Sequence, residues 1–400
     1  MVPNDYINGR KAKEVYELIR RHGEISKLDL KKFSGLTVST LTRLLDELTE
    51  QDLILEVGLG ESRGGRRPIL YRTNPKFSYV FGLDISRTNS KLVLCDLHLT
   101  KLDTHVWKMD DTMTPNKLIQ EMVEKIKEML IKHGIDVNSV LGMGIGAVGP
   151  LDRKSGKILN PKNFPSPGWE EVDICSIAEE KLGFYVTLDN GANAAILGEY
   201  WSEVGEQVEH LLYLHVGVGI RSSMIVGGQL VYGAVDMEGS VGQMIIQCDG
   251  PTPRHTTGNY GSWESFVSTY ALEQMVKTAL KMGRTSVLNQ YTDCVELIKY
   301  PLIDQALRED DHLVKEIFNQ VACYFGIGLA NLLNISHPQK VILGGPLISG
   351  NNLFYEQAIE VALKKTYYAP TYKVEFEISR LGDDAVAIGA AAKVVKQLTD

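Results

Sequence analysis

Small hydroxyl side chains and one arginine gather at the start of a helix that the sequence predicts from Thr37 to Leu48. The apolar residues recur at helical spacing along one face of it: Val38, Leu41, Leu44, Leu45 and Leu48. The opposite face carries the hydrogen-bonding residues Ser39, Thr40, Thr42 and Arg43. Short polar side chains on the first turns of a helix can reach base edges in the major groove of DNA, while the apolar face holds the helix on its scaffold. These four residues are therefore candidate DNA contacts.

A second cationic group follows in the loop between two short predicted strands, Leu53 to Val57 and Ile69 to Arg72. Three arginines lie among four glycines in this loop: Arg63, Arg66 and Arg67. A flexible cationic loop suits phosphates or a minor groove. A solvated hairpin would have a similar composition, but the helix that precedes it favours a DNA-binding wing.

Two further helices are needed to hold these side chains. Ser26, with an acidic residue three positions later, predicts the start of a short helix that ends at Gly35. An amphipathic helix from Arg10 to His22 precedes it and is closed by Gly23. Helix, turn, helix and basic loop together predict a winged helix-turn-helix domain over residues 1–75.

Composition restricts the remaining possibilities. The 400 residues have a net charge of −8, yet residues 1–76 carry 14 Lys and Arg against 11 Asp and Glu, and the rest 28 against 39. A basic head on an acidic body argues against general polyanion binding and for a local DNA contact. Five cysteines without a Cys-x-x-Cys pair indicate reduced thiols. Because we find no signal peptide and no apolar run of the ~18 residues that a membrane span needs, we expect a cytoplasmic protein with no membrane contact.

After Pro75 the chain alternates strands and helices in an order that occurs twice. The first series is predicted as strands 79–85, 91–96 and 102–108, a helix 115–133, a buried strand 140–146, a helix 174–182, a strand 185–188 and a helix from Ala192. The second is predicted as strands 210–216, 222–226 and 229–232, helices from Trp263 and Asp311, a buried strand 340–343 and a final helix 384–395. This order predicts two similar α/β lobes, about 76–195 and 196–400, with a cleft between them.

Several short motifs follow one another along the chain: Arg63–Pro68, Leu83–Ser86, Gly144–Pro150, Asn163 with Trp169, Asn190–Ala195, Gly258–Glu264 and Gly344–Gly345. In this order they make the chain resemble the ROK family of repressors, open reading frames and kinases over nearly its whole length. It is most similar to the repressor branch, which includes xylose- and N-acetylglucosamine-responsive proteins. The resemblance implies a winged helix-turn-helix followed by a two-lobed actin/hexokinase-like body whose cleft binds a sugar.

The sequence departs from the family's kinases where the general base is expected. Those kinases carry an aspartate directly after the asparagine that matches Asn190, and this chain has Gly191, which cannot take a proton. Asp189 and Glu199 are near in sequence, but Asp189 alternates to the other side of an extended strand end. The resemblance therefore implies a scaffold with no catalytic residue rather than an enzyme.

The family's phosphate loops and zinc site are altered as well. Ser86-Arg87-Thr88 and Val216–Arg221 place side chains where glycine backbone would approach phosphate. One histidine and three cysteines bind zinc in the family; the matching residues here are Gln243, His255, Thr257 and Ser262. This set lacks the thiolates that zinc prefers. We expect no ATP, no metal and no other cofactor.

The resemblance also carries over a candidate effector set: Asn163, Asn190, Ser240, Gln243 and Glu264. Amides and a carboxylate over an apolar floor suit a polyol, and Trp169 or Trp263 is expected to contribute to that floor. The same residues would equally fit a loop network that satisfies itself in a body without a ligand. Arg221 could face a ligand phosphate, although a surface salt bridge is its expected role.

The sequence thus predicts a ligand-responsive transcriptional regulator, a repressor of genes for carbohydrate uptake and catabolism such as xylose metabolism. A homodimer or dimer of dimers would match a palindromic operator, with helices near Ala271 and Val321 as candidates for the coupling or dimer surface. Two alternatives stay open. One is an active ATP-dependent sugar kinase with a fused DNA-binding head, and the other is a regulator that senses a protein partner through a ligand-free body.

Overall fold

The computed structural model describes residues 6–60, 67–161, 164–202, 208–236, 239–254, 258–367 and 370–399. The chain forms two compact units, one of residues 1–207 and 384–400 and one of residues 208–383. The lobe boundary expected near residues 195 and 196 falls inside a helix, because the helix that begins at Gly191 continues to Ser202. The last helix of the chain returns to the first unit.

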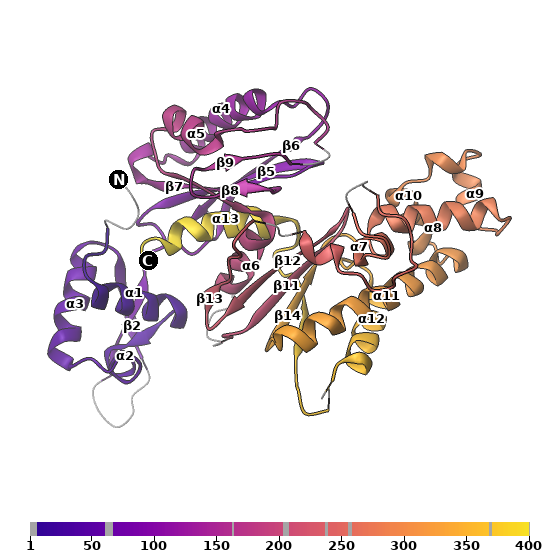
Figure 1. Ribbon diagram of the computed structural model, residues 1–400. Helices are drawn as coiled ribbons and strands as arrows, with labels where there is room; N and C mark the ends of the chain where they lie inside the picture. Colours follow the sequence, from indigo (N-terminus) through magenta and orange to yellow (C-terminus); the bar gives the residue numbers. More distant parts are fainter. Residues whose placement is uncertain are drawn as a thin grey trace. The chain divides into compact units, whose positions relative to one another are not determined.

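Residues 6–74, called the head below, contain three helices and a small sheet (Figure 1). Its elements are α1 (Arg10–His22), β1 (Ile25–Ser26), α2 (Lys27–Ser34), α3 (Val38–Glu50), β2 (Ile54–Leu59) and β3 (Ile69–Thr73). The sheet is antiparallel, in the order β1-β3-β2. The leucines predicted to line one face of α3 are all buried: Leu41, Leu44, Leu45 and Leu48. Ser26 and Thr37 cap α2 and α3 by accepting from the N–H groups of Asp29 and Thr40.

The rest of the first unit is a five-stranded sheet in the order β10-β7-β4-β5-β6. Its elements are β4 (Tyr79–Ile85), β5 (Asn89–Asp96), β6 (Lys101–Lys108), α4 (Pro115–His133), β7 (Val140–Ala147), α5 (Ile174–Leu182), β10 (Val186–Asn190), α6 (Gly191–Ser202) and α13 (Ala385–Lys396). The short strands β8 (Leu151–Asp152) and β9 (Lys157–Ile158) pair with each other. Helices α4 and α5 pack their apolar residues on one face of the sheet, and α13 lies on the other (Figure 1).

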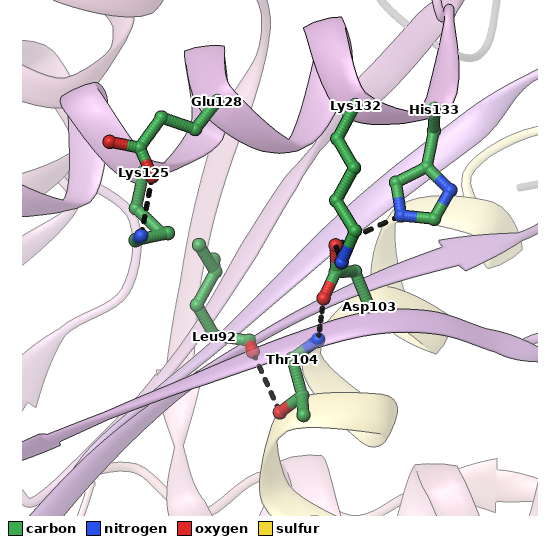
Figure 2. A network of polar contacts seen from close by, with 7 residues as sticks. All are labelled: Leu92, Asp103, Thr104, Lys125, Glu128, Lys132 and His133. Atoms are coloured by element: carbon green, nitrogen blue, oxygen red, sulfur yellow. Dashed lines mark hydrogen bonds and ion pairs between the residues drawn. The ribbon is translucent and has the colours of Figure 1, made fainter.

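A polar network joins β6 to α4 at the edge of this sheet (Figure 2). The carboxylate of Asp103 accepts hydrogen bonds from Lys132 Nζ at 2.8 Å and from His133 Nε2 at 2.9 Å. The backbone N–H of Thr104 also donates to Asp103. The network therefore fixes the last turn of α4 over the edge strand.

The second unit repeats the arrangement with a sheet in the order β13-β12-β11-β14-β15. Its elements are β11 (Leu211–Val216), β12 (Ile220–Val226), β13 (Gln229–Leu230), α7 (Trp263–Phe266), α8 (Thr269–Lys281), α9 (Leu288–Tyr291), α10 (Tyr300–Arg308), α11 (His312–Ser336), β14 (Lys340–Gly344), α12 (Asn352–Lys365) and β15 (Glu375–Ile378). In both units, the first two consecutive strands pair antiparallel and a later strand joins in parallel. This repeat confirms the predicted α/β body. Among the described helices, none is long and apolar enough to cross a membrane.

Candidate DNA-binding surface and effector pocket

The four predicted contact residues of α3 lie on one side of that helix. Ser39 and Arg43 are exposed, and Thr40 and Thr42 are half-buried. Arg43 forms an ion pair with Glu47 at 2.5 Å, one turn further along. Exposed pairs of this kind contribute little to stability, so the guanidinium can exchange its partner for a phosphate or a base at small cost.

Lys27 adds a cation to this surface that the sequence did not single out. It begins α2, and its Nζ donates to Thr42 Oγ1 at 3.2 Å. The hydroxyl of Thr42 in turn donates to the carbonyl of Val38 at 2.9 Å. The sequence contained a signal for this contact. Lys27 directly follows the predicted cap residue Ser26, and in a helix-turn-helix the first residues of α2 lie next to the start of α3.

Only part of the predicted basic wing can be placed. Arg63 and Arg66 lie outside the described residues, and Arg67 is exposed at the end of the loop. Strands β2 and β3 pair on either side of it, with a register shift between Glu56 and Gly58. The backbone N–H of Gly60 donates to the carbonyl of Pro68 at 2.8 Å and closes the base of the loop.

The strand end at Asp189 and Asn190 is fully buried and internally bonded. The Asp189 carboxylate has no exposed surface and forms an ion pair with Lys393 of α13 at 2.6 Å. It also accepts from Asn193 Nδ2 at 3.0 Å. Gly191 opens α6, where Asn190 Oδ1 accepts from the N–H of Asn193 at 2.7 Å. Asn190 therefore caps α6, and both Asn190 and Asp189 accept hydrogen bonds from Asn193.

In the second unit, a cavity of about 800 Å³ brings two of the candidate effector residues together. Gln243 and Glu264 both line it, and Ser240 does not, although it begins the same short helix, Ser240–Gln243. Asn190 belongs to the other unit, and Asn163 lies outside the described residues. The volume falls within the range of small-molecule sites.

The side chains of Gln243 and Glu264, the two effector candidates in this wall, also accept hydrogen bonds from backbone N–H groups. Gln243 Oε1 accepts from the N–H of Asn259 at 3.0 Å, and Asn259 Nδ2 donates to the Gln243 carbonyl at 2.9 Å. Glu264 Oε2 accepts from the N–H of Ile220 at 3.1 Å. A Cβ at Gly219 would lie 2.2 Å from that oxygen, so a larger residue at position 219 would require the Glu264 carboxylate to move.

The aromatic lining of the cavity differs from the expected one. Trp169 and Trp263 are 2% and 0% exposed, and each packs in the core of its own unit, so neither forms a floor. The aromatic residues of the cavity are Phe266, Tyr270 and Tyr324. The rings of Phe266 and Tyr324 lie 4.2 Å apart, and the Arg254 guanidinium lies 5.1 Å from the Tyr270 ring. Phe266 and Tyr270 are four residues apart in the sequence, and this spacing was the signal from which a shared position on the cavity wall could have been predicted.

The positions matching the family's zinc ligands are filled with hydrogen-bonding groups. Ser262 is buried and its hydroxyl lies 2.6 Å from that of Ser265. Together with Gln243 it ties the loop to the cavity wall, while His255 and Thr257 lie outside the described residues. Within the described parts of the chain, no group of three or more His, Cys, Asp or Glu side chains is arranged to hold a metal ion.

Arg221 is not among the described residues that line the cavity. It stands on β12 directly across from His215 of β11. Burial, with Arg221 as a second cause, lowers the pKa of His215 to about 4, so this imidazole is neutral at physiological pH.

Comparison with known proteins gives a consistent result. Residues 80–397 match the model of the ROK family. A xylose repressor of Caldicellulosiruptor bescii is 30% identical over 374 residues, which cover 94% of this chain and 92% of the relative. The transcriptional dual regulator NagC of Escherichia coli K12 is 24% identical over 98% of this chain and 94% of its own.

A solved ROK family transcriptional regulator, a homologue of the E. coli MLC protein, superimposes with a TM-score of 0.81 at 21% identity and covers 98% of this chain and 96% of its own. This likeness shows that the two chains share their fold. The family match spans well over half of the sequence, and the full-length relatives agree with it. The chain belongs to the ROK family.

Proposed function

We propose that this protein is a transcriptional repressor that binds operator DNA through its head and responds to a carbohydrate. The observation that carries the proposal is the exposed polar face of α3, with Ser39 and Arg43 outward on a helix whose leucines are buried. Relatives that match nearly the whole chain are named as a xylose repressor and an N-acetylglucosamine repressor. In the winged helix-turn-helix we assign to residues 1–75, α3 enters the major groove and the loop with Arg63, Arg66 and Arg67 contacts the backbone.

The body acts as a sensor and not as a kinase. Gly191 offers no carboxylate, and the Asp189 carboxylate is fully buried in an ion pair with Lys393. In the glycine turn after β11, the N–H of Gly217 donates to the carbonyl of Gly219 and that of Ile220 donates to Glu264. Backbone groups that a kinase would offer to phosphate are thus already bonded within the protein.

We assign the effector to the cavity of the second unit, with Gln243 and Glu264 in its wall. Asn163, Asn190 and Ser240 stay predicted effector contacts from the resemblance. Serines, amides and one carboxylate alternate there with aromatic rings, which suits a polyhydroxylated ring with apolar faces. Relatives named for xylose and N-acetylglucosamine make these two sugars the first probes.

Calorimetry with D-xylose and N-acetylglucosamine tests the sensor. For the sugar that the wild-type protein binds, we expect Tyr324→Ala to weaken binding about tenfold, because the sugar ring loses the aromatic side chain on which it stacks. Gln290→Ala on α9 is the control, since this exposed amide is not part of the cavity wall. If no saccharide gives a binding heat but the protein binds its operator tightly, the effector would be a protein partner and not a carbohydrate.

Recovery of duplexes from genomic DNA at low salt tests the repressor. We expect a protein that retains a discrete set of fragments and loses affinity steeply as salt rises. Sugar-dependent formation of ADP and a phosphorylated sugar by the purified protein would reject the proposal in favour of a kinase.

A further inference from the structure

Helix α6 connects a candidate effector residue to the head. It begins after Asn190, whose side chain caps its first turn, and it ends at Ser202. In its last turn Trp201 lies against α1, with the guanidinium carbon of Arg20 3.7 Å from the centroid of the Trp201 ring. An arginine stacked on tryptophan at this distance is a favourable cation–π contact.

Arg20 is held so that its flat face meets the ring. Its Nε and Nη2 each donate to one oxygen of Glu17 at 2.8 Å, and Glu17 also accepts from Arg21 at 2.7 Å. The Arg20 side chain is only 14% exposed, and that of Glu17 21%. Burial opposes ionisation of Glu17, but the hydrogen bonds from the two arginines outweigh it and lower the pKa of this carboxyl. The pair therefore stays charged and fixes the plane of the guanidinium.

Helix α6 is tightly packed along most of its length. Residues from Gly191 to Glu199 are buried, and α6 packs against α13 with glycine in the contact. A Cβ at Gly389 would lie 1.7 Å from the carbonyl oxygen of Ala194. At this point backbone meets backbone, so a shift of α6 there has to move α13 as well.

A second contact supplies a pivot for the head. His98, in the turn between β5 and β6, places Nε2 2.8 Å from Thr73 Oγ1 and 3.0 Å from the Thr73 carbonyl. Thr73 ends β3, the last strand of the head. With this end tied to the body, a rotation of α1 that starts at Arg20 would carry α3 with it, because α1 packs on α3.

We propose that the contact between Arg20 and Trp201 is the joint through which occupancy at the Asn190 end of α6 reaches the DNA-reading helix. This inference rests on the proposed function, since it concerns how the sensor acts on the head. Any ligand group that reorients the Asn190 side chain changes the cap of α6, and the opposite end of that helix carries the ring on which the head is seated. Breaking the joint leaves the head able to bind DNA and removes its response.

The first test needs neither ligand nor operator. The fluorescence of Trp201 is obtained by subtracting the spectrum of the matching Trp201→Phe protein. The other three tryptophans, Trp107, Trp169 and Trp263, are at most 5% exposed. We expect Asn190→Ala and Arg20→Ala each to change this emission. Arg10→Ala is the matched control, because Arg10 pairs with Glu14 on the same helix and is 92% exposed. An unchanged Trp201 emission in Asn190→Ala would overturn the joint even if the protein proves to be a repressor.

The second test measures the response itself. Operator affinity is determined with and without the sugar that wild type accepts, D-xylose and N-acetylglucosamine being the probes. If wild type changes its affinity about 5- to 150-fold on binding the sugar, Arg20→Ala and Trp201→Ala should each bring the ratio to about one, and the double variant no further. A Trp201→Ala protein that keeps the wild-type ratio contradicts the joint. A wild type that selects no duplex rejects the proposed function instead, while the emission test still decides the joint.

Discussion

The buried pair of Asp189 and Lys393 shows how a single side chain can be removed from chemistry by its partner. Asp189 lies two residues before Gly191, the position that the resemblance matches to a kinase base, and its carboxylate is fully buried and bonded to α13. From the alternation of side chains along a strand, the sequence predicted only that Asp189 lies on the other side of the strand end, not that it is buried in an ion pair. It could not show the partner, because Lys393 lies 204 residues away along the chain.

We therefore expect Asp189→Asn to affect stability rather than any activity. The substitution leaves Lys393, 18% exposed, with an uncompensated charge, and should lower the free energy of unfolding by about 3 kcal/mol. Urea denaturation measures this. Lys393→Met in the same protein should recover part of the loss, since it removes the unpaired charge. Equal stability of Asp189→Asn and wild type would show that the pair contributes nothing.

Asp103 gives a prediction on pH. The hydrogen bond from Lys132 is the largest cause that lowers the pKa of this carboxyl to about 2, and His133 adds to it (Figure 2). A carboxyl whose pKa is depressed on folding stabilises the protein above its unfolded pKa of about 4, and the contribution disappears as the pH falls from there to about 2. Asp103→Asn should therefore lower the stability at pH 7 and make it depend less on pH in this acid range.

Thermal unfolding of the two proteins across that range is the measurement. Asp111→Asn is the control, since Asp111 is exposed in the turn before α4. Parallel stability curves for wild type and Asp103→Asn would contradict the role of this network.

At the scale of elements, helical spacing and cap residues predicted α1, α2, α3 and α4 closely. Their signals are local: Ser26 and Thr37 each cap a helix with an apolar face. The short helices α9 and α10 and the edge strand β15 were not predicted. They pack at the periphery of the second unit, where tertiary contacts decide the conformation more than periodicity does. The helix predicted from Trp263 is only four residues long, and α8 begins at Thr269 after a buried Ser268 that caps it.

The wing is the element whose role can be tested by charge alone. Arg66→Ala with Arg67→Ala should weaken binding to all duplexes and reduce the slope of log affinity against log salt by about two, one for each lost phosphate contact. Filter binding at several salt concentrations measures the slope. Arg308→Ala on α10 is a matched control, since this arginine is 78% exposed and belongs to the second unit. An unaltered slope in the double variant would remove the wing from the interface.

For the whole molecule, the sequence predicted two similar α/β lobes but not how the chain is divided between them. The helix α13 is apolar on nearly every side, which indicates burial, yet nothing local shows that it returns to the first unit. Its seat is made by Gly82 and Gly144 on the sheet, where a Cβ would lie 1.9 and 1.8 Å from carbonyl oxygens of α13. Pattern analysis cannot find such a contact, because it depends on residues far apart in sequence. Of the candidate effector set, Gln243 and Glu264 share the wall of one cavity, while the two tryptophans expected to contribute to its floor are core residues.

The proposed two-fold assembly makes a prediction about operator geometry. Two heads in a homodimer place their α3 helices on one side of a duplex, with half-sites about 34 Å apart, one helical turn. Inserting about five base pairs between the half-sites turns one of them to the far side of the DNA, so one head loses its groove and affinity should fall by at least about tenfold. Inserting about ten base pairs returns both half-sites to the same side of the DNA. Affinity should then recover in part, to the extent that the two heads can separate. Titration of the three duplexes at one salt concentration gives the comparison. Equal affinity for all three would mean that each head binds alone, and the two-fold assembly would then have no part in reading the operator.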